Sequence, residues 1–222
     1  MWEYPAFDFY GLGGSGPQEA RDNKSYIRFF HASPGAPNVD IFVNNVPVVK
    51  NLPYLGFTEY SKINPGSYNI KVFPAGTTKS PVIDTNVNIP GRGIFTAAAV
   101  GKLPNISAKL INDPIIPIEL GKSYVRFIHL SPDTPAVDIT LPDGTVVFKD
   151  VSYLEETQYI PLNPGVYTLQ ARPTGKKDIV LTVPNIRLMP NKLYTVYAVG
   201  LSAGRPPLQV VIPLDGGTYI NV

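Results

Sequence analysis

The stretch SYIRFFHASPGAPNVDI at Ser25–Ile41 returns as SYVRFIHLSPDTPAVDI at Ser123–Ile139, an offset of 98 residues. Ser, Tyr, Arg, Phe, His, Ser, Pro, Pro, Val, Asp and Ile recur in the same order in both copies. Self-similarity of this kind indicates a duplicated structural unit, and it constrains the fold more strongly than any single residue. The sequence therefore predicts two similar domains.

The match continues at an offset of 99 residues, after a one-residue insertion in the second copy. NPGSY at 64–68 pairs with NPGVY at 163–167, and the Val-Gly at 100–101 pairs with the Val-Gly at 199–200. We predict four parts of the chain: an arm and hinge at 1–23, a first domain at 24–113, a Pro-rich linker at 114–121, and a second domain with a C-terminal strand at 122–222.

Each copy consists of short runs rich in Val, Ile, Tyr, Phe and Thr, separated by turn residues. The chain has 24 prolines and 19 glycines, spread along its length. In SYNIKVF, apolar Tyr68, Ile70 and Val72 alternate with polar residues, as expected for a strand with one face in water. Strands of this length and spacing predict an all-β sandwich or barrel. NPG suits a type II turn, and hence a hairpin corner.

Composition excludes several classes of function. The 19 basic and 17 acidic residues nearly balance, so the electrostatic attraction that drives nucleic-acid binding is weak. The chain has no cysteine, which removes disulfides, thiol nucleophiles and thiolate metal sites. No apolar run approaches the length of a membrane span, and no secretion signal is recognisable. We expect no cofactor, no metal site and no membrane insertion.

The histidine motif invites comparison with a catalytic triad. His31 and His129 are the only histidines, and each is followed by a serine and an aspartate at fixed spacing, namely Ser33, Asp40, Ser131 and Asp138. Residues i and i+2 of an extended segment lie about 7 Å apart, beyond hydrogen-bond reach. We therefore expect a structural role, in which a buried histidine donates a ring N–H to a carbonyl or carboxylate. Metal or ligand binding and catalysis are the alternatives.

Arg28 and Arg126 stand three residues before the two histidines. An arginine that alternates with aromatic residues on a strand is more often exposed to solvent, or paired with an aspartate, than used as a ligand clamp. We favour the first two roles.

The pattern R-F-[FI]-H-[AL]-S-P-x-x-P-x-V-D, with the later N-P-G-x-Y and V-G, resembles the DUF4397 family over about Lys24 to Asp215. That family occurs on bacterial surface proteins, particularly those of spore formers. The resemblance implies two tandem immunoglobulin-like β-sandwich domains and a cell-surface or spore-surface setting, and it implies no enzymatic activity. Because no export signal is recognisable, we expect assembly around a spore inside a mother cell, or release by lysis.

Residues 1–23 match neither repeat. The segment carries five aromatic residues, Trp2, Tyr4, Phe7, Phe9 and Tyr10, followed by four glycines of a flexible hinge, Gly11, Gly13, Gly14 and Gly16. Burial of five rings would contribute on the order of 10 kcal/mol, less the cost of ordering the segment. The arm either covers an edge of its own first domain or adds a strand to a neighbouring copy.

The second arrangement is head-to-tail and does not close on itself, so it predicts a filament. We therefore expect a structural subunit of an extracellular or spore-surface fibre, whose partners are copies of itself. Other surface proteins are further candidate partners. The alternative is a binding module for a glycan or protein, in which Tyr54, Tyr60, Tyr153 and Tyr159 stack on sugar rings. An enzyme is not expected. Gly216-Gly217 and the following TYINV predict a second hinge and strand.

Overall fold

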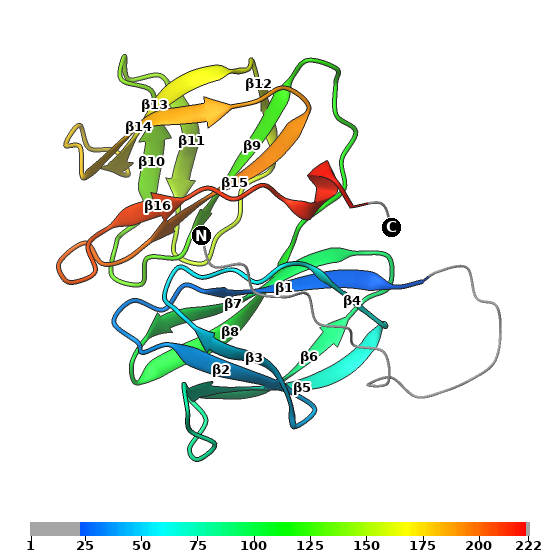
Figure 1. Ribbon diagram of the computed structural model, residues 1–222. Coiled ribbons are helices and arrows are strands. Elements are labelled where there is room, and N and C mark those ends of the chain that lie inside the picture. The colour runs from blue at the N-terminus through cyan, green and yellow to red at the C-terminus, as the bar shows by residue number, and fades with distance from the viewer. Residues whose placement is uncertain (1–22, 221–222) are drawn as a thin grey trace. The chain divides into compact units, whose positions relative to one another are not determined.

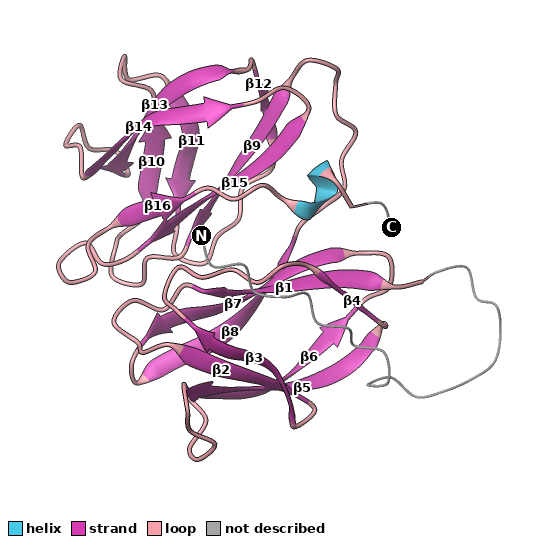
Figure 2. Ribbon diagram, viewed as in Figure 1, coloured by secondary structure: helices cyan, strands magenta, loops and turns pink. Residues whose placement is uncertain are grey.

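The computed structural model describes residues 23–220, and in that part of the chain nearly all regular structure is β-strand (Figures 1 and 2). The chain divides into two compact units, one reaching Ile115 and the other spanning Ile116–Thr218. The all-β fold with two sandwiches agrees with the sequence prediction. The aromatic arm and the hinge glycines lie outside the described residues.

The first unit contains two four-stranded sheets. One has the order β4-β1-β7-β8 and the other the order β3-β2-β5-β6. The strands are β1 (Ser25–His31), β2 (Val39–Val43), β3 (Val46–Leu52), β4 (Ser61–Ile63), β5 (Gly66–Pro74), β6 (Ile83–Ile89), β7 (Ile94–Lys102) and β8 (Asn105–Asn112).

The second unit repeats this topology. Its sheets have the orders β12-β9-β15-β16 and β11-β10-β13-β14. The elements are β9 (Ser123–His129), β10 (Val137–Thr140), β11 (Val146–Val151), β12 (Ile160–Leu162), β13 (Gly165–Pro173), β14 (Leu181–Leu188), β15 (Lys192–Val199), β16 (Gln209–Val211) and the 3-10 helix η1 (Gly216–Thr218).

The repeated motif stretch forms the centre of each unit. β1 lies parallel to β7, and β9 lies parallel to β15, while the other strand pairs are antiparallel. Alternate residues of β1 and β7, including Phe29 and Ala97, meet alternate residues of β2 and β5, including Ile41 and Val72, in one apolar core. The period-two pattern of the sequence therefore corresponds to the inner faces of a sandwich.

The turn between β2 and β3 is a tight hairpin loop. Asn44 and Asn45 have φ values of 49° and 65°, which are the left-handed conformations that a two-residue hairpin loop of type I′ requires. Asparagine tolerates this region better than most residues.

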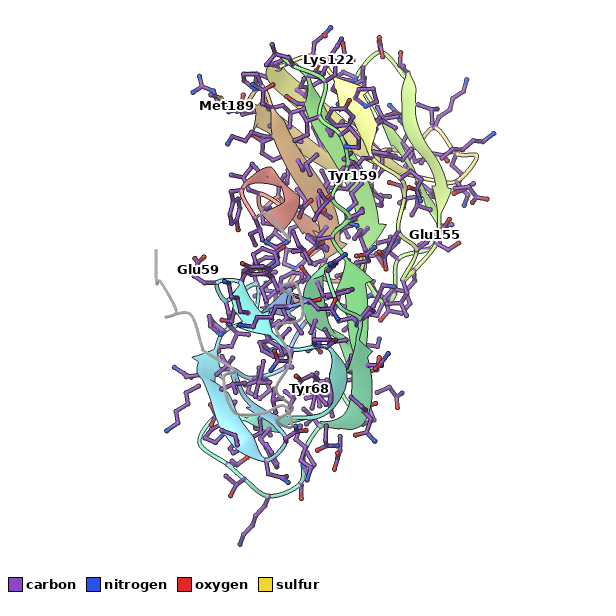
Figure 3. The ribbon with its side chains drawn as sticks, turned by 90° about the vertical axis from the view of Figure 1, so that its right-hand side faces the viewer. Glu59, Tyr68, Lys122, Glu155, Tyr159 and Met189 are labelled. Atoms are coloured by element: carbon purple, nitrogen blue, oxygen red, sulfur yellow. The ribbon has the colours of Figure 1, made fainter. Side chains whose placement is uncertain are left out.

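The prediction of a hairpin at NPG is wrong. β4 pairs with β1 and β5 pairs with β2 and β6, so NPG carries the chain from one sheet to the other. The φ of Gly66 is 152°, whereas a type II turn needs about 80°. Instead, Tyr68 donates a hydrogen bond from its hydroxyl to the Asn64 carbonyl oxygen at 2.8 Å, and Tyr167 does the same to Asn163. This is the tyrosine corner that joins the sheets of many sandwiches (Tyr68 in Figure 3).

The two units differ most at the edge strand. β8 forms eight residue pairs with β7, from Phe95–Asn112 to Lys102–Asn105, but β16 forms only three with β15. Pro213 occupies the position of Ile111, and a proline has no N–H to continue the ladder.

The described end of the chain is also not the predicted strand. Residues Gly216–Thr218 form η1, and Thr218 accepts a hydrogen bond at its side-chain oxygen from the Leu193 N–H at 2.9 Å. The backbone turns here because the buried Asp215 is held by Thr195 and Tyr159.

Candidate functional site

The His-Ser-Pro motif forms a buried corner at the end of β1. The Nε2 of His31 lies 3.0 Å from the Pro37 carbonyl oxygen, and the Ser33 N–H points at Nδ1 from 3.4 Å. This pattern suits the neutral tautomer with its proton on Nε2. The Ser33 hydroxyl donates to the Gly101 carbonyl oxygen at 2.6 Å. The motif therefore ties the loop after β1 to itself and to β7.

The second unit repeats the same contacts. The Nε2 of His129 lies 3.3 Å from the Pro135 carbonyl oxygen, and the Ser131 hydroxyl donates to the Gly200 carbonyl oxygen at 2.7 Å. His129 and Ser131 are both fully buried. Burial lowers the pKa of both His31 and His129, because it penalises the charged imidazolium, while the neighbouring proline carbonyls oppose that shift.

The aspartates of the motif have other partners. Asp40 accepts backbone N–H bonds from Asn51 at 2.7 Å and Gly76 at 2.9 Å. Asp138 accepts the corresponding bonds from Asp150 at 2.8 Å and Gly175 at 3.1 Å. Each carboxylate thus joins two loops of its own sandwich. The structure gives histidine, serine and aspartate separate backbone partners, and no triad geometry arises among them.

The two repeated arginines belong to a buried polar network. Arg28 donates from Nε to the Thr96 hydroxyl oxygen at 2.8 Å, and Thr96 donates in turn to Asp113 at 2.6 Å. The Tyr60 hydroxyl donates to the same Asp113 oxygen at 2.7 Å. The guanidinium carbon of Arg28 lies 4.6 Å from the centre of the Tyr60 ring and 4.8 Å from that of Phe57. Arg28 is therefore not exposed to solvent.

The network recurs in the second unit. Arg126 donates to Thr195 at 2.7 Å, and Asp215 accepts bonds from Thr195 and Tyr159, both at 2.5 Å. Burial and the Asp215 charge raise the pKa of Tyr159, so the phenol stays protonated and acts as a donor (Tyr159 in Figure 3). Arg126 also lies 3.9 Å from a carboxylate oxygen of Glu156.

Four members of these networks are not among the residues predicted from the sequence, namely Thr96, Asp113, Thr195 and Asp215. The threonines stand at matching positions of the repeat, but the aspartates are separated by 102 residues because the loop before β16 is longer than the loop before β8. If the alignment of the two copies is extended past the Val-Gly pair with a three-residue gap, IND at 111–113 aligns with PLD at 213–215.

The Val-Gly pair that closes each repeat has a clear geometric purpose. Gly101 and Gly200 have φ values of 86° and 88°. A Cβ at Gly101 would overlap the Asn105 carbonyl oxygen, and one at Gly200 would overlap the Pro207 carbonyl oxygen. Only glycine combines a positive φ with the absence of a Cβ. It therefore fixes the position of the carbonyl oxygen that accepts the hydrogen bond from Ser33 or Ser131.

The model described as "Domain of unknown function (DUF4397)" matches residues 25–140 and 123–215. The chain belongs to the DUF4397 family. In this DUF4397 chain, the residues shared by the two copies include those that hold the loops, those of the buried network and several of the apolar core.

Several solved structures match this DUF4397 chain at low similarity. The C-terminal domain of AlgF from P. aeruginosa is 23% identical, with a TM-score of 0.33, over 42% of this chain and 98% of that one. The Bacillus anthracis TIE protein is 12% identical, with a TM-score of 0.26, over 84% of this chain and 34% of that one. A streptococcal virulence factor, described as binding alpha-glucan, is 11% identical, with a TM-score of 0.25, over 89% of this chain and 100% of that one. No curated protein matched the chain.

The tyrosines considered for sugar stacking contact the DUF4397 motif residues. Tyr54 and Tyr153 meet the rings of His31 and His129 edge to face, at 6.0 and 6.3 Å between centres. The ring centre of Tyr60 lies 4.6 Å from the guanidinium carbon of Arg28, and that of Tyr159 lies 5.0 Å from the guanidinium carbon of Arg126. Across residues 23–220, no three His, Cys, Asp or Glu side chains are grouped so as to hold a metal ion. In the same range, no helix is long and apolar enough to cross a membrane.

Proposed function

We propose that this chain is a non-enzymatic structural subunit of a bacterial cell-surface or spore-surface fibre. In the proposed assembly, the aromatic segment 1–10 of one copy adds as a strand to the free edge of β16 in the next copy. The observation that carries the proposal is the difference between the edge strands of the two sandwiches.

The first sandwich has a protected edge. β8 reads NISAKLIN, its ladder with β7 is eight pairs long, and the side chain of Lys109 lies in the middle of the strand. A lysine on an edge strand disfavours the addition of another strand, because its charge would have to be desolvated.

The second sandwich lacks this protection. Val211 stands where Lys109 stands, as the pairing of Ala98 with Lys109 and of Tyr197 with Val211 shows. The segment LQVVI at 208–212 carries no charge, and all five of its residues are only half-buried. An uncharged, incompletely covered edge strand is a favourable template for a strand from another chain.

The surface beside this edge is apolar. Val210 of β16 and Ile212, the residue after β16, pack against the core. Leu181 and Val183 of β14 also contact this core and remain partly exposed. A gap of about 20 Å³, lined by Leu181, Val183, Leu208 and Val210 among others, lies between the sheets at this seam. It is only large enough for one water molecule, so a docking strand would lie along the seam without entering the core.

The sequence of segment 1–10 has the complementary character. Its five aromatic residues would cover apolar surface, and its backbone would pair with β16. Because the donor segment and the acceptor edge are different surfaces, the contact is heterologous and propagates into a filament. The arginines, histidines and serines of the motif have internal partners, which supports a structural role over a catalytic one.

Negative-stain electron microscopy of the full chain, beside a variant lacking residues 1–16, tests this function. We expect filaments from the full chain and single particles from the truncated one. Filaments from both would disprove a role for the arm, and single particles from both would disprove a self-assembling subunit.

A further inference from the structure

The second sandwich has a surface hollow that the fibre proposal does not use. It has a volume of about 370 Å³ and lies beside the ends of β10, β11 and β13. Its basic lining residues are Arg172, Lys176 and Lys177, and its other side chains include Thr140 and Val146. This volume lies within the range of small-ligand pockets, about 300–1,000 Å³.

The first sandwich has no such lining at the equivalent place. Phe42 and Phe73, the counterparts of Thr140 and Arg172, meet edge to face at 5.2 Å between ring centres. In the second sandwich an aromatic pair is thus replaced by a polar one, in which Arg172 donates from Nε to the Thr140 hydroxyl oxygen at 3.2 Å.

The turn that follows β13 is also more polar and more basic than the turn that follows β5 in the first copy. The first copy reads PAGTTK and the second reads PTGKKD, so Thr77 and Thr78 become Lys176 and Lys177. Three positions that are uncharged in one sandwich are therefore cationic in the other, and all three line one hollow.

Three cations, Arg172, Lys176 and Lys177, outnumber the two carboxylates that line the hollow, Asp138 and Asp143. Arg172 donates to the Thr140 hydroxyl, the Gln170 side-chain oxygen and the Lys177 carbonyl, which are all neutral acceptors. Asp138 accepts the Asp150 and Gly175 N–H groups, and Asp143 accepts the Thr145 N–H. Within residues 23–220, no carboxylate forms an ion pair with Arg172, Lys176 or Lys177.

We propose that this hollow binds an anionic group, a carboxylate, sulfate or phosphate, carried by a sugar-sized ligand. Lys176 and Lys177 supply the charge, and Arg172 supplies a guanidinium already held in place by three neutral acceptors. Val146, which is half exposed, provides an apolar contact for the uncharged part of the ligand.

Isothermal titration calorimetry on the full chain tests the proposal, with glucuronate, glucose 6-sulfate and glucose 6-phosphate as probes and glucose as the uncharged control. We expect at least one charged probe to bind, more weakly at higher salt, with glucose giving no heat of binding. Comparison of the three charged probes identifies the preferred anion. Binding of glucose as tight as that of every charged probe, or binding of none of the four, would overturn the proposal.

Two variants locate the binding. Lys176→Thr with Lys177→Thr installs the turn residues of the first copy and should weaken the charged probe about tenfold or more, since it removes two charged donors. Thr140→Phe with Arg172→Phe installs its aromatic pair and should abolish binding. Lys79→Gln, at an exposed lysine of the first sandwich, is the matched control and should change nothing. Unchanged affinity in the lysine double variant would contradict the assignment.

Discussion

Lys109 of β8 and Val211 of β16 occupy the same position on the edge strands of two otherwise closely similar sandwiches. Their partners on the neighbouring strands, Ala98 and Tyr197, correspond in the repeat. The duplication thus provides an internal comparison, in which one edge carries a charge and the other does not. Only the uncharged edge is shortened by a proline, at Pro213.

Removal of the hydroxyl that joins arginine to aspartate should destabilise the second sandwich. Thr195→Val removes one hydrogen-bond partner from each of the buried residues Arg126 and Asp215, and we expect a loss of about 2–4 kcal/mol in the free energy of unfolding. Denaturant titration, followed by far-UV circular dichroism, measures this free energy of unfolding. Thr182→Val, on an exposed position of β14, is the control and should stay within about 0.5 kcal/mol of the parent chain. Equal effects of the two substitutions would show that the Thr195 hydroxyl contributes no more to stability than an exposed hydroxyl does.

Gly200 should tolerate no side chain. Gly200→Ala places a Cβ against the Pro207 carbonyl oxygen at a φ of 88°, whereas Gly144→Ala, at a φ of 89°, meets open space. Both variants carry the backbone strain of about 1 kcal/mol, and the first adds a clash with backbone. We expect the unfolding midpoint of Gly200→Ala to fall well below that of Gly144→Ala. Matching midpoints would mean that the loop moves aside at no cost.

The two buried histidines should make the protein less stable in mild acid. Burial lowers their pKa below the usual 6.5, so between about pH 7 and 5 the unfolded chain binds more protons than the folded one. The free energy of unfolding should therefore be highest above pH 7 and fall as the pH drops through this range. Protonation of Nδ1 would also remove the acceptor for the Ser33 or Ser131 N–H.

A variant carrying both His31→Gln and His129→Gln tests the origin of that slope. Glutamine does not titrate, so its stability should vary less between pH 7 and 5 than that of the parent chain. The same slope in both proteins would assign the pH dependence to other groups.

Much of the fold could be predicted from the sequence, because period-two alternation and turn residues act locally. The alternating stretch SYNIKVF lies in β5, as expected for a strand with one face in water. At NPG the structure differs from the predicted hairpin, because local turn chemistry does not determine which sheet the next strand joins. That choice depends on the bond from Tyr68 to the Asn64 carbonyl and on the apolar faces that the sandwich must bury.

The candidate sites were less predictable, because they depend on contacts between residues far apart in the chain. Arg28 and Asp113 are linked through Thr96, and no spacing rule identifies such a chain of hydrogen bonds. The cationic hollow also requires the turn after β13 to lie above β10. By contrast, the role of Gly101 could have been suspected from its recurrence at Gly200, since a repeated glycine often marks a required positive φ.

The most direct test of the fibre account is the state of assembly of Val211→Lys, measured by negative-stain electron microscopy of the full chain with segment 1–16 intact. This substitution gives β16 the charge that β8 has, so we expect single particles in place of filaments. Val166→Lys, at an exposed position of β13 that is 63% accessible, is the matched control and should form filaments. Filaments of normal length and number from Val211→Lys would contradict the claim that the edge of β16 accepts the arm.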